Sequence, residues 1–296
     1  MRPHAVRRVL ARRLRTLEND LPAALGHDVE ALHRTRVASR RLREALPVIG
    51  GGANEGRHHA RKTHHLVREL TRALGGVREI DVGIGLLDEL EAAHPDLSVA
   101  IETTRAAMKR ERADRREEMA RHLADIKPGK LARKVSSLVE ATGQVSPAER
   151  LQRLRRRIAR RADQLEQAVD AAGALYAFDR LHLVRIATKK LRYALELAQE
   201  PGGVRTERLT ERLRGIQSLL GRLHDLDVVA RHVRSAAGDT SERPGSDAER
   251  LFAVIEHETR VLHADYLART RAIADVIARC RGPLDRRLAT AQRAAA

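Results

Sequence analysis

Cysteine is almost absent from the sequence, and aromatic residues are few. Cys280 is the only cysteine among 296 residues, so no internal disulfide can form and a zinc site built from several cysteines is excluded. Tryptophan is missing and aromatic residues make up 2% of the chain. This scarcity disfavours proteins that read single-stranded nucleic acid by stacking bases on aromatic rings. A core of Leu, Ala, Val and Ile remains, which favours packed helices over a sheet.

Long apolar runs are missing as well. No stretch approaches the ~20 apolar residues that span a bilayer, and the N-terminal MRPHAVRRVLARRL lacks the apolar run of a signal peptide. We therefore expect a cytoplasmic protein without a membrane span. Hydrophobic residues make up 42% and charged residues 33% of the chain, which indicates a globular protein with a sizeable core.

Positive charge is abundant. There are 57 Lys plus Arg against 40 Asp plus Glu, a formal net charge of +17. Such an excess repels itself in a compact fold, and a polyanionic partner would relieve the repulsion. Nucleic acid, an anionic membrane surface and polyphosphate are the classes of partner that this charge indicates.

Helical periodicity runs through nearly the whole chain, and no alternating strand pattern appears. Breaks are expected where Gly and Pro cluster, at residues 49–56, 94–96, 127–129, 200–203 and 238–247. The predicted helices span residues 3–20, 28–47, 57–75, 79–93, 97–127, 130–142, 147–172, 177–199, 205–221, 224–237, 246–281 and 283–293.

Two segments of the chain recur. LHRTRVASRRLREAL at 32–46 matches LHLVRIATKKLRYAL at 181–195, and ELTRALGGVREIDV at 69–82 matches GIQSLLGRLHDLDV at 215–228. We interpret this as an internal duplication, with a first half at about 5–143, a second half at about 147–281 and a C-terminal tail helix at 282–296. The expected fold is all-α: one domain of two pseudo-symmetric antiparallel helical bundles, of about four helices each.

Several predicted helices carry a row of cations on one face. On residues 32–46 these cations lie opposite the leucines, and the equivalent residues repeat the pattern at 181–195. Further rows follow i, i+4, i+7, i+11 spacing. The candidate anion-binding residues are His33, Arg36, Arg40, Arg41, Arg43, Arg61, His65, Arg68, Arg72, Arg78, Arg105, Lys109, Arg112, Arg116, His182, Arg185, Lys189, Lys190, Arg192, Arg214 and His224.

Rows of this kind suit repeated contact with phosphate. Arginine donates paired hydrogen bonds and keeps its charge, lysine adds point charge, and histidine gains charge as phosphates approach. If the apolar faces of the helices share one core, the rows converge on a single concave surface or pore. The alternative is a set of separate solvated faces.

These residues resemble the CHAD domain, named for its conserved histidine and α-helical fold. The resemblance lies in the duplicated H-x-x-R-[VI]-A-x-[RK]-[RK]-L-R motif and in the segments LGGVREIDV and LGRLHDLDV, and it covers residues 5 to 281. It implies two pseudo-symmetric helical bundles with a basic central groove or pore. It also implies binding of inorganic polyphosphate without catalysis or cofactor, and for some members an association with polyphosphate granules. The E-x-E-x-K signature of the CYTH triphosphatase domain is missing, so the resemblance implies a stand-alone member.

The second half departs from the first in places. Acidic or neutral residues at 207, 211 and 218 stand where Arg61, His65 and Arg72 stand, and His224 replaces Arg78. The basic surface is therefore expected to be lopsided. Asp81 and its counterpart at 227 are interpreted as structural, capping a helix or orienting an arginine.

Two rival functions stay open at the level of sequence. Sequence-independent binding of nucleic acid fits the charge. A metal-dependent polyphosphate-processing enzyme is less favoured, because neither a phosphate-binding G-x-x-x-x-G-K-[ST] loop nor an acidic triplet at metal-binding spacing occurs. In HHARKTHH, His58 and His65 lie about two turns apart, roughly 10 Å, which is too far to ligate one zinc ion.

Overall fold

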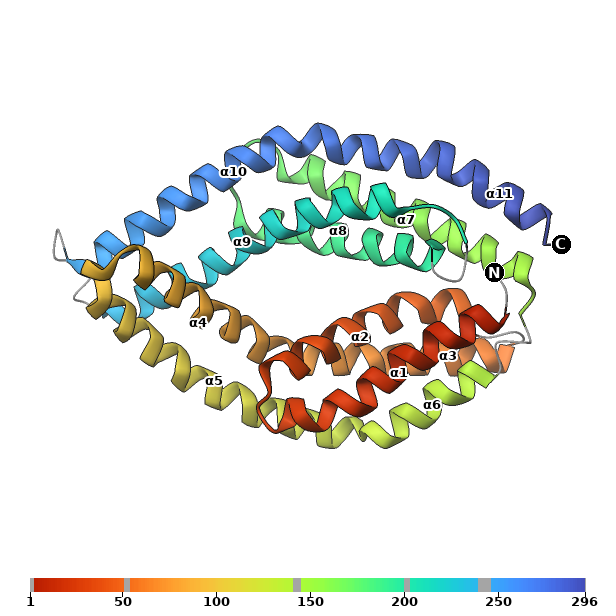
Figure 1. The fold of residues 1–296 in the computed structure, drawn as a ribbon, viewed down its shortest axis with the longest axis horizontal. Coiled ribbons are helices and arrows are strands. Elements are labelled where there is room, and N and C mark those ends of the chain that lie inside the picture. The colour runs from red at the N-terminus through yellow and green to blue at the C-terminus, as the bar shows by residue number, and fades with distance from the viewer. Residues whose placement is uncertain (1–2, 51–53, 141–144, 200–202, 239–245, 296) are drawn as a thin grey trace.

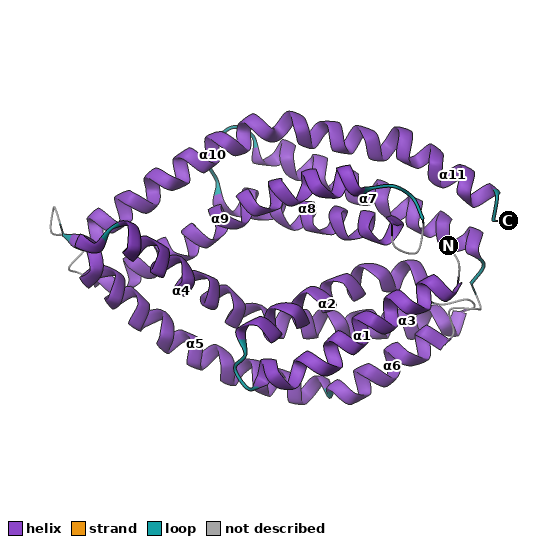
Figure 2. Cartoon of the chain, in the orientation of Figure 1, coloured by secondary structure: helices purple, strands orange, loops and turns teal. Residues whose placement is uncertain are grey.

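The computed structural model describes residues 3–50, 54–140, 145–199, 203–238 and 246–295. In these ranges the chain consists of helices joined by loops and contains no strand (Figure 2), which confirms the all-α class. The elements are α1 (Pro3–Leu25), α2 (Val29–Ile49), α3 (Asn54–Ala73), α4 (Gly75–Ala93), η1 (Pro95–Leu97), α5 (Ser98–Ile126), α6 (Pro128–Glu140), α7 (Pro147–Ala172), α8 (Phe178–Gln199), α9 (Glu207–Ala237), α10 (Asp247–Arg279), η4 (Cys280–Leu284) and α11 (Asp285–Arg293).

Most predicted helix boundaries agree with the structure. The expected breaks at 94–96 and 127–129 occur, the second at Lys127, whose φ of 53° ends α5 before Pro128 starts α6. Parts of the other breaks, residues 51–53, 200–202 and 239–245, lie outside the described residues. One prediction is wrong: the helices expected at 205–221 and 224–237 are a single helix, α9. A continuous buried stripe through Leu219, Leu223 and Leu226 carries the helix past Gly221.

Short polar residues fix the starts of three helices. Asp28 Oδ1 accepts a hydrogen bond of 2.9 Å from the Ala31 amide at the start of α2. Ser146 and Ser246 cap α7 and α10, and each accepts a bond from the amide of a glutamate three residues later. These S-x-x-E segments satisfy amide groups that the first helical turn leaves without partners.

The helices form two groups that share one end, here called the joined end, and that also touch where α2 packs against α7 and α8 (Figure 1). In one group α1, α2, α3 and α6 pack together; in the other, α7, α8 and α11 do so with parts of α9 and α10. At the joined end α4 and α5 pack against α9, and α5 packs against α10. The packing of α1 on α2 has its counterpart in α7 on α8, and that of α4 on α5 in α9 on α10. This correspondence is what an internal duplication would produce, although the duplication stays a prediction.

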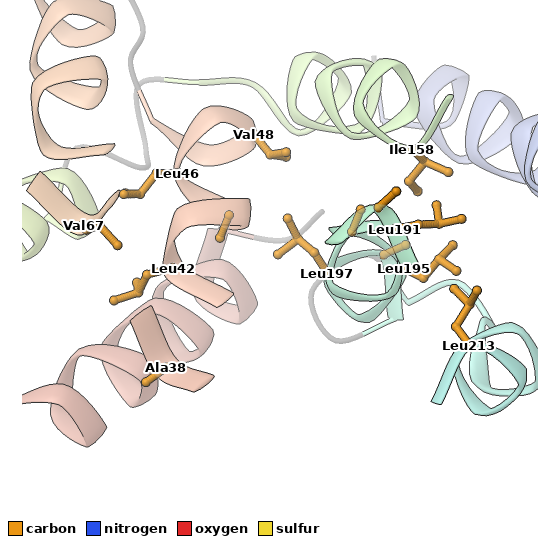
Figure 3. Packing of buried hydrophobic residues seen from close by; sticks show 14 of the residues in the cluster. Ala38, Leu42, Leu46, Val48, Val67, Ile158, Leu191, Leu195, Leu197 and Leu213 are labelled. Atoms are coloured by element: carbon orange, nitrogen blue, oxygen red, sulfur yellow. The ribbon is translucent and has the colours of Figure 1, made fainter. Parts of the chain in front are cut away.

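Buried apolar residues form two clusters. The larger cluster joins both groups; in it Leu42 and Leu46 of α2 lie toward Val67 of α3, while Leu191 of α8 lies toward Ile158 of α7 (Figure 3). The smaller cluster lies at the joined end and combines first-half side chains of α4 and α5 with second-half side chains of α9 and α10. The two halves therefore share a core, and the opposing positions of α2 and α8 are fixed by apolar packing.

The C-terminal segment packs on the body of the protein. After the π-helical turn η4, Asp285 of α11 receives two bonds of 2.9 Å from Arg155 of α7, and Leu288 is buried. No helix in the described part of the chain has the length and apolar character to cross a membrane.

Candidate functional site

Cations from three helices meet where α2, α4 and α8 approach one another. We call this set the central cation cluster: Arg36 and Arg40 of α2, Arg78 of α4, and Arg185 and Lys189 of α8. Its members are partly buried, and each lies close enough for its charge to lower the pKa of another residue at the site. The apolar faces of α2 and α8 turn toward α3 and α7, which leaves their cationic faces for this place.

Burial lowers the pKa values of these groups most, and the charges of the neighbouring cations lower them further. Burial, and then Arg40 and Arg185, lower the pKa of Arg36 to about 9. Burial, and then Arg185, Arg40 and Arg36, lower the pKa of Lys189 from 10.5 to about 5. The buried Nε–H groups of Arg36 and Arg185 have no hydrogen-bond partner among the described residues. Donors held without partners in a field of like charge are well suited to an anion from outside the chain.

A second group of cations continues along α2 toward its C-terminus. Arg43 of α2 and Lys190 of α8 lie close to Arg157 and Arg161 of α7, and burial followed by these charges lowers the pKa of Lys190. Here Glu44 is buried and accepts bonds of 2.8 Å from Arg157 Nε and 2.7 Å from Arg161 Nε. We call Arg43, Arg157, Arg161 and Lys190 the flanking cluster. Glu44 neutralises part of its charge, so Arg43 and Lys190 are the cations best placed for a ligand.

Three of the four predicted histidines, His33, His182 and His224, lie at one side of the central cation cluster. His33 keeps part of its side chain in solvent, and its partial burial, and then the charge of Arg78, lower its pKa. His182 Nδ1 lies 3.3 Å from His224 Nδ1, and His224 Nε2 lies 2.6 Å from Glu79 Oε1. The Phe178 ring stacks on His224 with the centroids 5.4 Å apart.

Other predicted residues are already engaged by carboxylates. Arg105 is buried and bound by Glu91 at 2.6 Å, by Asp88 at 3.2 Å and by Glu102. Arg192 is also buried and is bound by Glu196, the residue that receives Arg41 at 3.0 Å. These three arginines are structural in the ligand-free protein, and we do not retain them in the candidate site.

The rows on α3 and α5 do not join the central cation cluster. On α3, Arg61 is exposed, Arg68 binds His65 and Glu69, and Arg72 binds Glu69. On α5, Lys109 is exposed, Arg112 binds Asp81 at 2.7 Å, and Arg116 lies beside that pair. On α9, the exposed Arg214 binds Glu211, and Asp227 orients Arg231 at 3.0 Å. The interpretation of Asp81 and Asp227 as partners of arginines agrees with these contacts.

Sequence reasoning missed two groups of site residues. Glu79 and Asp225 both reach the central cation cluster, and they occupy equivalent positions in the segments 69–82 and 215–228. An acidic residue at the same place in both segments was the signal that could have found them. Arg157 and Arg161 lie in the dense run RLRRRIARR at 153–161, where i,i+4 spacing on one face of α7 was the available signal.

A pocket of about 450 Å³ lies beyond the flanking cluster, between the C-terminal end of α2, α3 and α7. Arg61, His64, Arg153 and Arg156 line it together with Glu149. Arg153 donates to the Gly50 carbonyl at 2.8 Å and to Glu149 at 2.6 Å. This arginine therefore stabilises the wall of the pocket. Throughout the described ranges, no group of three or more His, Cys, Asp or Glu residues is arranged to hold a metal ion.

Comparisons with known proteins agree with this architecture. The sequence profile of the CHAD domain matches residues 8–234. The crystal structure of the CHAD domain from the plant Ricinus communis is similar, with a TM-score of 0.58 and 23% identity over 95% of this chain and 91% of that one. PptA from Streptomyces chartreusis is similar with a TM-score of 0.56 and 17% identity, over 94% and 98% of the two chains. No curated protein gives a significant match. The chain belongs to the CHAD domain family, which is associated in general with polyphosphate binding.

Proposed function

We propose that this protein binds inorganic polyphosphate, without transforming it, across the central cation cluster and the flanking cluster. The observation that carries the proposal is the meeting of four guanidinium groups and one lysine from three helices around few carboxylates. An unbranched chain of phosphates supplies one negative charge per unit and oxygen acceptors on every side. It satisfies unpaired arginine donors without needing any base-specific contact.

The spacing of the cations also suits a linear ligand. Arg36, Arg40 and Arg43 follow one face of α2, and successive members are about 4.5 to 6 Å apart along the helix axis. Lys189 and Lys190 of α8 face them from the other half. A flexible phosphate chain lying between α2 and α8 would make many weak contacts at once, and its affinity would rise with chain length.

Polyphosphate is favoured over nucleic acid because the two aromatic rings described beside the clusters are already packed. Phe178 is packed on His224, and the buried Tyr193 lies under the guanidinium of Arg192. Base stacking, which supplies much of the affinity for single strands, therefore has no platform here. Glu44 is held by two arginines and Glu79 by His224, and neither belongs to a group of described residues arranged for a metal ion, which supports binding without catalysis.

The test is a titration with polyphosphates of defined length at two salt concentrations. We expect tight binding that strengthens with length, and weak binding by the double variant Arg36→Gln, Arg185→Gln. The matched control removes two exposed arginines elsewhere, Arg110→Gln and Arg260→Gln, and should bind like the wild type. Equal losses in both double variants would show that only net charge matters and would reject the site.

Competition and turnover distinguish the rival functions. Polyphosphate should displace DNA far better than DNA displaces polyphosphate, whereas equal exchange would indicate a general polyanion binder. Release of orthophosphate with Mg²⁺ or Mn²⁺ would indicate an enzyme. We place the protein in the cytoplasm, on free or granular polyphosphate, and microscopy of a fluorescent fusion in polyphosphate-rich and polyphosphate-depleted cells tests that location.

A further inference from the structure

Two histidine rings face each other at the edge of the central cation cluster. The Nδ1 atoms of His182 and His224 are 3.3 Å apart, and the ring centroids are 4.9 Å apart. On its other side, His224 Nε2 lies 2.6 Å from Glu79 Oε1. Because Glu79 belongs to α4 and the histidines to α9 and α8, this chain of three groups crosses from the first half to the second.

The hydrogen-bonding capacity of these groups fixes most of the protons. A carboxylate only accepts, and the bond from His224 lowers the pKa of Glu79, so His224 Nε2 carries a proton. The two facing Nδ1 atoms share one proton, because two N–H groups or two lone pairs would repel. In a neutral pair this proton belongs to His182, since a neutral His224 already holds its single proton. His182 Nε2 is then left with a lone pair.

A lone pair at that nitrogen repels a phosphate oxygen, which is also an acceptor. One added proton on His182 Nε2 converts it into a donor and gives the pair a single positive charge beside Glu79. We propose that the His182–His224 pair takes one proton from solvent when a phosphate chain binds, and that His182 Nε2–H then donates to a phosphate oxygen. This inference rests on the proposed function, and it couples polyphosphate binding to the uptake of one proton.

The surroundings make this uptake depend on the ligand. Arg185 and Lys189 of α8 lie beside His182, Glu79 faces it from α4 and His224 from α9, while Asp225 of α9 reaches the two α8 cations. Arg36 and Arg40 of α2 reach Lys189. In the free protein, burial, and then His224, Arg185 and Lys189, lower the pKa of His182. Phosphate charge acts in the opposite direction and favours the protonated pair.

In the first half of the chain, the position equivalent to His224 is occupied by an arginine, which does not titrate near neutral pH. Arg78 aligns with His224 and lies beside His33 as His224 lies beside His182. An arginine keeps its proton at all relevant pH. The variant His224→Arg therefore copies the first half: its guanidinium can pair with Glu79 and donate to His182 Nδ1. A neutral His182 would then carry its proton on Nε2 without any uptake.

Calorimetry in two buffers of different ionisation enthalpy measures the protons taken up. With long-chain polyphosphate at pH 7.5, the wild type should take up about one more proton than His224→Arg. From pH 8 to pH 6, wild-type affinity should rise by up to about tenfold more per pH unit than that of the variant. Equal uptake and parallel pH profiles would overturn the inference. Circular dichroism verifies that the variant folds.

A second measurement needs no variant. In wild-type protein labelled with ¹⁵N-histidine, the His182 Nε2 resonance at pH 7.5 should change from unprotonated to protonated as polyphosphate is added. An Nε2 that stays unprotonated in the saturated complex would overturn the inference while leaving polyphosphate binding intact. Absence of binding by the wild type, even at pH 6, would instead remove the proposed function and this inference with it.

Discussion

Replacing Lys189 by methionine should stabilise the ligand-free protein. Burial and three arginines lower the pKa of Lys189 from 10.5 to about 5, so at pH 7 the lysine is charged in the unfolded chain and neutral in the folded one. Releasing that proton over 3.5 pH units costs up to about 5 kcal/mol. Because the side chain is only partly buried and water relaxes around it, we expect a gain of about 2 to 5 kcal/mol from Lys189→Met.

The pH dependence of the stability gained by Lys189→Met tests the same reasoning independently. The folded pKa lies below the unfolded one, so the penalty is absent above about pH 10.5 and grows as the pH falls. It reaches its full size near pH 5 and stays constant below that. The advantage of Lys189→Met over the wild type should therefore be large at pH 6 and should shrink steadily toward pH 10.

Urea unfolding at pH 6, 7.5 and 9 measures this difference, and the melting temperature should rise by roughly 4 to 10 °C at pH 7. Lys189→Arg serves as the control that restores a permanent charge, and it should be no more stable than the wild type. Polyphosphate binding by Lys189→Met should weaken, since the phosphate chain loses the Lys189 amine as a hydrogen-bond donor. A methionine variant that is no more stable than the wild type, or equally stabilised at every pH, would refute the reasoning.

Three further outcomes are expected. Raising salt from 50 to 200 mM should weaken polyphosphate binding about a hundredfold, from a slope of roughly −3.5 for about five neutralised phosphates; fluorescence titration measures the affinity. Glu44→Gln should destabilise by about 3 kcal/mol in urea, because it leaves two largely buried arginines without their carboxylate. The pKa of Glu44 is lowered, so this wild-type contribution is lost as the pH falls through the folded pKa. Gly83→Val should cost about 1 to 3 kcal/mol because its side chain would overlap Met108, whereas Gly85→Val, which meets open space, should be nearly neutral in thermal unfolding.

The helices and their order could be predicted because the signals are local. The apolar stripe of α2 has helical period, Pro128 starts a helix, and S-x-x-E segments precede α7 and α10. In the first half a turn at Leu74 separates α3 from α4, whereas α9 has no break at the equivalent place. The matching segment of α9 has one glycine in place of two and continues its buried stripe.

The candidate site could be predicted only in part, for a geometric reason. Wheel positions identify which residues share a helix face, and so they placed Arg36 with Arg40 on one helix and Arg185 with Lys189 on another. They contain no information about which faces meet. The same reasoning therefore also selected Arg105, whose face on α5 meets the carboxylates of α4. Only the ion pairs between helices show whether a cation is free to bind a ligand or already stabilises the fold.

The core shared by α4, α5, α9 and α10 has a consequence for the kinetics of binding. This core holds the cationic faces of α2 and α8 opposite each other before any ligand binds, although their charges repel. No closing step then precedes capture, so association should be diffusion-limited and steered by charge, and ionic strength should act mainly on the on-rate. Dissociation, by contrast, requires many weak contacts to one phosphate chain to break together. The residence time should therefore depend on how many phosphates contact the cations of α2 and α8.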